Sequence, residues 1–575
     1  MFKSPAFLYR AVLAATFSVA ACGTLSQTYS PRPSQGPQSV APDAAPDSDL
    51  SEEVLYELLV GEIALQRGDP ALASQIYLDL AKRTRDPRVA RRAIEVANFA
   101  RLPDAALDAA KIWQSIEPAS PQALQFVSAL LIAAKRVDEA EPYLEKLLAA
   151  DGVNLESGFL QLNRLLSGNP DKAANLRVVR RLAAQQPGLA SAHLAIAQAA
   201  LAAGDDAAAL AAVRRATALR PEWETAAIFE AQVLQKRSGA EAASSLGAFI
   251  EKNPAARDAR LNYARALVLD KRYPEARKQF EALLAANPGN PEVIYAVGLL
   301  AFQLKDFQVA EENMKRLLSL GYRDPNGVRY LLGQIAEEQK QWPRAIQWYK
   351  QIDEGDQVLA ARMRIAQVMA KQGKLDEARK YLKSVKAESP AEQVQLIVAE
   401  AQLLREANRN RDAFDMLDQA LKKDPDQPEL LYDFALTAEK LERFDLLEAK
   451  LRKLIQVRPD HAHAYNALGY SFAERNLRLP EAQKLIEQAL QLAPEDNFII
   501  DSLGWVLYRQ GDLKGAAREL RRAYGGRPDA EIGAHLGEVL WVMGERAEAD
   551  KVWREALDTS PENETLLKTI KRLKR

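Results

Sequence analysis

The chain has 575 residues, of which 77 are Lys or Arg and 78 are Asp or Glu, so its charges nearly cancel. This balance excludes the broad positive footprint of a DNA- or RNA-binding surface. Beyond the N-terminal segment no run of 18 apolar residues appears, which excludes a membrane-spanning helix there, and a single cysteine excludes an internal disulfide.

Residues 1–21 are predicted to be an export signal. Lys3 and Arg10 precede an apolar run over residues 11–21, which is too short to span a bilayer but typical of a signal-peptide core. The run ends in Val-Ala-Ala directly before Cys22, which resembles the lipobox of bacterial lipoproteins. The resemblance implies cleavage before Cys22 and acylation of its thiol and new amino group, palmitate being a typical chain. The alternative is an ordinary buried cysteine of a signal peptide.

Residues 22–50 are predicted to be a flexible polar tether. They are rich in Ser, Pro, Gln, Ala and Asp and carry few large apolar side chains, so they cannot bury enough surface to offset ordering. A coil of this length spans on the order of 30 Å. In lipoproteins an aspartate after the lipidated cysteine can retain the protein in the inner membrane, and here that position is Gly23. The resemblance therefore implies the outer membrane of a Gram-negative bacterium, lipid-anchored and facing the periplasm.

From Ser51 onward the sequence predicts helices almost throughout, because apolar residues recur at three- and four-residue spacing. Prolines recur at intervals of 33 to 35 residues, and the gap between Pro288 and Pro390 equals three such intervals. The prolines of this series are Pro187, Pro221, Pro254, Pro288, Pro390, Pro425, Pro459, Pro494, Pro528 and Pro561. Extended to both ends, with Pro87, Pro118 and Gly152 among the closing positions, the period predicts about fifteen helix pairs. The array divides into a degenerate N-terminal and central part, residues 51–390, and a better-conforming part, residues 391–575.

Three consecutive copies between residues 461 and 561 show the pattern best. Each has a Leu-Gly pair in its first helix, an alanine early in its second helix and a closing proline. The glycines are Gly469, Gly504 and Gly537, and the alanines are Ala482, Ala516 and Ala549. Small residues at these positions allow two antiparallel helices to approach closely. The period and the order of residues resemble the tetratricopeptide repeat, a helix-turn-helix unit.

This resemblance implies an all-α protein: a right-handed α-solenoid of about fifteen helix pairs that stack to bury their apolar faces. Residues 564–575 are predicted to form a C-terminal capping helix, whose basic side chains face water. Its basic end could instead contact anionic lipid or an acidic partner.

Motifs for catalysis, metal binding or cofactor binding are absent from the sequence. The four histidines, His193, His461, His463 and His535, do not form the zincin spacing, and no nucleophile elbow, P-loop or dinucleotide glycine cluster occurs. We therefore expect no enzymatic activity, no cofactor, no metal and no small-molecule substrate. An enzyme of cell-wall metabolism remains the third and least favoured hypothesis.

Function is then expected to reside in surface contacts with other proteins. In tetratricopeptide repeats the first helices line the concave side, where partner segments often lie. Carried onto the last three copies, the resemblance predicts a partner-binding groove made of His463, Asn466, Tyr470, Asp501, Trp505, Tyr508, Arg509, Glu538 and Trp541. Aromatic and Arg side chains are the types that anchor partners. The alternative is that Trp505 and Trp541 fill contacts between helices.

The resemblance extends beyond the repeat. The stretches at residues 50–64, 501–508 and 535–541, behind a lipobox and a polar tether, are similar to a family of proteobacterial outer-membrane lipoproteins. One member is the adaptor of a periplasmic carboxyl-terminal processing protease and binds both the protease and the cell-wall hydrolases that it degrades. The similarity implies a lipid-anchored scaffold with these protein partners and without nucleic acid. The alternative is an assembly or secretion factor for an envelope machine that exports polysaccharide or pili.

Overall fold

The computed structural model describes residues 51–150 and 153–574. Within these ranges it contains thirty-one α-helices and one short 3-10 helix, with no strand. The described chain divides into two compact units, one ending at Tyr322 (unit 1) and one beginning at Arg323 (unit 2). The predicted all-α class is therefore confirmed for the described residues.

Unit 1 holds eight helix pairs. They are α2 (Glu52–Gln66) with α3 (Pro70–Thr84), α4 (Pro87–Phe99) with α5 (Pro103–Ile116), α6 (Pro121–Ala133) with α7 (Val137–Leu148), α8 (Leu155–Leu165) and η1 (Leu166–Gly168) with α9 (Lys172–Ala184), α10 (Ala190–Ala202) with α11 (Asp206–Leu219), α12 (Glu224–Gln235) with α13 (Gly239–Lys252), α14 (Arg257–Leu269) with α15 (Tyr273–Ala286), and α16 (Pro291–Gln303) with α17 (Phe307–Ser319).

Unit 2 holds seven helix pairs and a final single helix. They are α18 (Pro325–Glu338) with α19 (Trp342–Lys350), α20 (Val358–Lys371) with α21 (Leu375–Ser384), α22 (Pro390–Glu406) with α23 (Asn410–Lys423), α24 (Pro428–Lys440) with α25 (Phe444–Val457), α26 (Ala462–Glu474) with α27 (Leu479–Leu492), α28 (Asn497–Gln510) with α29 (Leu513–Gly526), α30 (Ala530–Met543) with α31 (Arg546–Thr559), and α32 (Glu564–Leu573) alone.

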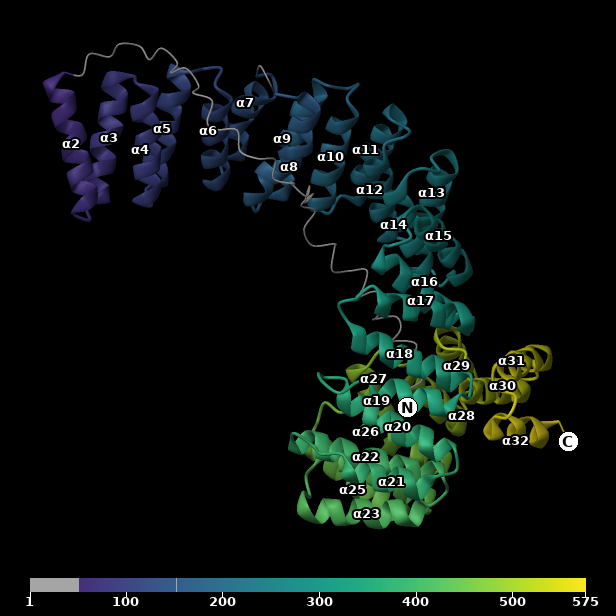
Figure 1. Cartoon of the computed structure of the whole chain (residues 1–575). Helices are drawn as coiled ribbons and strands as arrows, with labels where there is room; N and C mark the ends of the chain where they lie inside the picture. The colour runs from purple at the N-terminus through teal and green to yellow at the C-terminus, as the bar shows by residue number, and fades with distance from the viewer. Residues whose placement is uncertain (1–50, 151–152, 575) are drawn as a thin grey trace. The chain divides into compact units, whose positions relative to one another are not determined.

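The pairs stack in chain order, as the labels in Figure 1 allow the reader to follow within each unit. The two helices of a pair pack on each other, and the second helix of most pairs packs on the first helix of the next. Each unit is thus an α-solenoid, and the two units together supply the fifteen pairs that the period predicts. The right-handed course of the array stays a prediction, as does the division of the array at residue 390.

Helix ends follow local chemistry. Asn290 accepts hydrogen bonds from the amides of Glu292 and Val293 just before Pro291 opens α16. Not every proline of the periodic series closes a helix, however. Pro87 and Pro390 are instead the first residues of α4 and α22. Proline is tolerated at this position because the first amide of a helix has no hydrogen-bond partner within the helix. The period therefore marks the junction between pairs rather than a fixed helix end.

The predicted close contacts between paired helices are present. A Cβ atom added to Gly469, Gly504 or Gly537 would lie within 3.0 Å of the second helix of its own pair. The alanines at the matching second-helix position, Ala482, Ala516 and Ala549, are fully buried. The small residues are therefore required by the approach of the two helices.

Gly469→Ala is expected to lower the free energy of unfolding by about 1–3 kcal/mol, the usual cost of overpacking. The added Cβ would lie 2.8 Å from the backbone oxygen of Ala482 and 2.7 Å from Ile486 Cγ1, so a rotamer change alone cannot relieve the clash. Urea unfolding followed by far-UV circular dichroism measures the change. Gly525→Ala is the matched control, because nothing lies within 4 Å of its added Cβ. Equal stability of the two variants would contradict the close approach.

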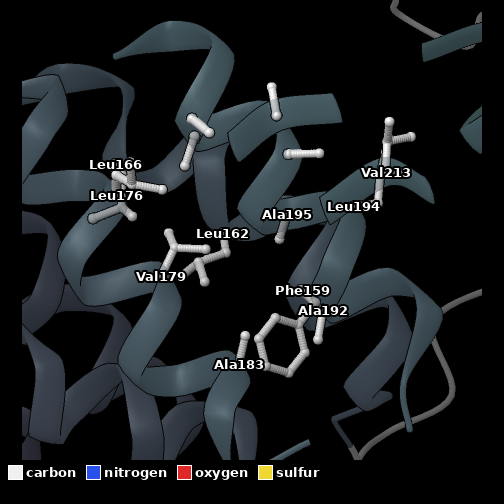
Figure 2. Close-up of a cluster of buried hydrophobic side chains, with 14 of the residues drawn as sticks. Phe159, Leu162, Leu166, Leu176, Val179, Ala183, Ala192, Leu194, Ala195 and Val213 are labelled. Carbon is white, nitrogen blue, oxygen red and sulfur yellow. The ribbon is translucent and has the colours of Figure 1, made fainter. Parts of the chain in front are cut away.

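The pair formed by α8 and α9 departs from the regular pattern of two α-helices. Helix α8 has only 11 residues and continues as η1. The turn that follows is closed by two buried amides: Asn169 Nδ2 donates to Asn175 Oδ1 at 2.8 Å, and Asn175 Nδ2 donates to the Leu166 carbonyl at 2.8 Å. The hydrophobic core of unit 1 nonetheless continues through this pair, since Phe159 and Leu162 belong to the buried cluster drawn in Figure 2.

Buried carboxylates join successive pairs in unit 2. Glu337 on α18 accepts hydrogen bonds from Tyr349 Oη at 2.7 Å and Arg364 Nε at 2.6 Å. Glu400 on α22 accepts from Arg379 of the preceding pair, and Asp433 on α24 accepts from Arg405 of the preceding pair. Each carboxylate lies on a first helix and has a cationic partner, so none of the three is buried as an unpaired charge.

The predicted signal peptide, the tether and the lipidated residue Cys22 lie outside the described residues. No helix in the described ranges is long and apolar enough to cross a bilayer.

Candidate functional site

The nine side chains predicted to form a groove lie on three consecutive first helices of unit 2, which we call the first-helix face. Helix α26 carries His463, Asn466 and Tyr470, α28 carries Asp501, Trp505, Tyr508 and Arg509, and α30 carries Glu538 and Trp541. These helices are neighbours, because α26 packs against α28 and α28 packs against α30. The repeat thus brings residues from three hairpins to one region.

Three of the nine side chains are buried and contact other helices of the array. The two carboxylate oxygens of Asp501 each lie 3.0 Å from His535 Nδ1 on α30. Trp505 stacks on the ring of His535 with centroids 4.2 Å apart, and its Nε1 donates to Glu474 at 2.7 Å. These contacts tie α26, α28 and α30 together.

Glu538 is the third buried side chain. It accepts a hydrogen bond from Tyr508 Oη at 3.1 Å on one oxygen and from Arg572 of α32 on the other. All basic residues of the capping helix were expected to face water, but Lys574 lies 2.6 Å from Asp550, and Arg572 makes this ion pair although its side chain is 58 % exposed. It attaches the cap to the last hairpin by a charge-assisted hydrogen bond.

The other six side chains retain some exposure. The His463 side chain is 54 % exposed, with Nε2 3.9 Å from Asp496. Asn466 Oδ1 has no hydrogen-bond partner, although the atom is buried. Arg509 donates to the carbonyls of Ala473 and Glu474, which directs its guanidinium back onto α26.

Trp541 lies toward the cap. Its ring is 5.6 Å from that of Trp553, and Arg546 and Lys574 lie over its face. Tyr470 and Tyr508 are half-buried between helices. The residues most available to a partner are therefore at the α26 side of the face, with His463 foremost.

Burial and nearby carboxylates both act on the Tyr470 hydroxyl. Burial, together with Glu474, Asp501, Glu531 and Glu439, raises the pKa of the Tyr470 hydroxyl well above its ordinary value. At His535 burial alone would lower the pKa, but the charge and hydrogen bond of Asp501 outweigh it and raise the pKa above the ordinary histidine value. The region thus favours a protonated His535.

Sequence reasoning missed His535, Glu474 and Arg572 as members of this network. A signal was present, because Asp501 and His535 are separated by 34 residues, and so are Glu538 and Arg572. One full period places two residues at equivalent positions of adjacent hairpins. In the described part of the chain no group of three or more His, Cys, Asp or Glu side chains is arranged to hold a metal ion.

Comparisons with known proteins agree with this architecture. Tetratricopeptide-repeat models match residues 234–291, 295–358, 360–391, 398–446 and 475–531. A tetratricopeptide-repeat-containing protein of Pseudomonas aeruginosa is 34 % identical over 533 residues, which cover 92 % of this chain and 90 % of that protein.

Two solved structures are also similar. A thermophilic tetratricopeptide-repeat protein of Thermus thermophilus is 24 % identical, with a TM-score of 0.29, and the match covers 32 % of this chain and 97 % of that one. MamA of Desulfovibrio magneticus is 16 % identical, with a TM-score of 0.26, and the match covers 31 % of this chain and 99 % of that one.

Proposed function

This chain belongs to the tetratricopeptide-repeat family, whose repeats generally mediate protein–protein contact without catalysis, and from that premise we propose that it is a non-enzymatic scaffold of the bacterial periplasm. In this proposal Cys22 carries the lipid that anchors it to the outer membrane. Its partners are a carboxyl-terminal processing protease and the cell-wall hydrolases that the protease degrades. The scaffold promotes degradation by holding protease and substrate together.

One observation carries the proposal. The α26 side of the first-helix face presents His463, Asn466 and Tyr470 together, supported from behind by the buried contacts of Asp501, Trp505 and His535. Side chains held on rigid helices lose little conformational entropy when a partner binds. The carboxylates around Tyr470 favour a partner segment that carries basic or hydrogen-bond-donating side chains.

The sequence in front of the array supports the rest of the proposal. A lipobox-like segment followed by a polar stretch would keep fifteen helix pairs close to a membrane surface without embedding them. Two partners bound to one scaffold meet at an effective concentration far above the concentration of the same proteins free in solution. A tethered array can therefore promote proteolysis without supplying any catalytic group.

Affinity purification of the full chain from solubilised membranes tests the proposal. We expect a periplasmic carboxyl-terminal processing protease and at least one cell-wall hydrolase to co-purify. His463→Ala combined with Asn466→Ala is expected to reduce the recovery of one of them by at least about fivefold, because truncating one interface side chain often costs about 1 kcal/mol. The matched control is Lys484→Ala, an exposed position on the second helix α27.

Two outcomes would count against these assignments. Recovery of neither a protease nor a hydrolase with the unmodified chain would remove the adaptor proposal. Unchanged recovery with the double variant would place the contact outside the α26 side of the first-helix face.

A further inference from the structure

The first helix of the described chain exposes an apolar stripe. Leu55, Tyr56, Leu59 and Ile63 of α2 are between 46 % and 68 % exposed. Leu55, Leu59 and Ile63 follow one another at four-residue spacing and therefore share one face of the helix. We call these four residues the α2 stripe.

The stripe is open within the described residues because α2 is the first helix of the described stack. In the next two pairs the first helix packs on the second helix of the preceding pair, as α4 does on α3 and α6 does on α5. Helix α2 packs on α3, with no earlier helix in the described residues. A solenoid end normally needs a polar cap. The C-terminal end has one, since α32 covers α30 and leaves Lys568 and Lys571 exposed.

Two possible covers fit the stripe poorly. Glu52 and Glu53 open α2 and are exposed, so an anionic membrane surface would repel this end of the helix. Residues 23–50 directly precede it, but their sequence carries few large apolar side chains to place over three aliphatic residues and a tyrosine. The cover must supply apolar side chains and a positive charge.

We propose that the α2 stripe pairs with the α2 stripe of a second copy of this chain, the two helices running antiparallel about a two-fold axis at Leu59. Leu59 is the midpoint of α2, which runs from Glu52 to Gln66. In this register Leu59 meets Leu59 of the second copy, and Leu55 meets Ile63. A two-fold interface of this kind uses the same patch on both molecules.

Charges at the two ends of the stripe match the same register. Arg67 caps the C-terminal end of α2, is exposed and has no ion pair within the described part of the chain. The antiparallel register places it beside Glu52 and Glu53 of the second copy, of which Glu53 already lies 3.5 Å from Arg83 of its own chain. It also sets the positive end of each helix dipole beside the negative end of the other.

Disulfide trapping in membranes that contain the full chain tests the pairing. Leu59→Cys is expected to form a disulfide-linked dimer under mild oxidation, seen at twice the mass of the monomer on a non-reducing gel. We expect its rate to exceed that of Phe99→Cys by at least about tenfold, because only the two-fold axis holds two thiols together. The unmodified chain, with Cys22 alone, gives the background. Equal rates for the two cysteine variants would overturn the proposal.

Substitutions in the Leu59→Cys background separate a second copy from any other cover. Leu55→Glu is expected to abolish trapping, whereas Leu567→Glu on the exposed face of α32 leaves it unchanged. Glu52→Arg and Arg67→Glu are each expected to slow trapping by about two- to tenfold, since each places like charges together. The two charge substitutions combined in one chain restore the rate, because the exchanged charges meet between copies. A double variant that stays slow would exclude the two-fold register.

Discussion

Replacing Trp553 by alanine is expected to lower the free energy of unfolding of the last hairpin by about 3–5 kcal/mol, the range observed when a buried tryptophan is truncated. The Trp553 side chain is almost fully buried in the cluster that joins α30, α31 and α32. Its removal leaves a cavity beneath the capping helix. Urea unfolding followed by hydrogen exchange of the α30 and α31 amides measures the loss.

Trp553→Phe is the matched control. Trp553 Nε1 is buried without a hydrogen-bond partner, so phenylalanine keeps an aromatic ring and removes an unsatisfied donor. We expect this variant to lose much less stability than Trp553→Ala. Equal losses would show that the indole contributes through contacts other than ring packing.

The same site tests why the repeat needs glycine. A Cβ atom added at Gly537 would lie 2.0 Å from Trp553 Nε1, so Gly537→Ala is expected to cost about 1–3 kcal/mol in the unmodified chain. In the Trp553→Ala background the same methyl group enters the cavity and should cost almost nothing. Residues in contact show such non-additive effects. Additive losses would contradict the proposed contact between Gly537 and Trp553.

The periodic placement of small residues and prolines was enough to predict the fold. The period indicates about fifteen helix pairs, and the described part of the chain has fifteen, even where no proline marks the junction, as between α19 and α20. Periodicity works here because each hairpin must bury its faces on its neighbours, so a shift of register would expose apolar residues along the whole array. The division into two units at Tyr322 was not predicted, since the period continues across it.

The candidate site was harder to predict than the fold. The first-helix positions could be assigned from the repeat, but their burial could not, because an aromatic residue at helical spacing suits a core and a surface equally. Trp505 and Glu538 turn out to be buried against neighbouring helices, while His463 is exposed. The information that separates these cases lies in residues one hairpin away. His535 and Arg572 become relevant only when the sequence is compared with itself one period later.

The buried pair of Asp501 and His535 should make the stability of the last hairpins depend on pH. Because the folded-state pKa of His535 is raised, its stabilising contribution is fully present below the unfolded value of about 6.5 and is lost as the pH rises through the folded pKa. Asp501→Ala removes the partner and leaves a buried ring nitrogen unsatisfied, which is expected to cost about 2–3 kcal/mol at pH 6. At pH 9 the difference between the two proteins should be smaller.

Urea unfolding at pH 6 and pH 9, followed by tryptophan fluorescence, measures both differences, since Trp505 stacks on the His535 ring. The control is His463→Asn, because the His463 side chain is exposed. This substitution is expected to change the free energy of unfolding little at either pH. Asp501→Asn keeps the size and one acceptor oxygen but removes the charge, so it should lose less than alanine and show less pH dependence than the unmodified chain. A loss in Asp501→Ala that is the same at both pH values would mean that the protonation state of His535 does not change between pH 6 and pH 9.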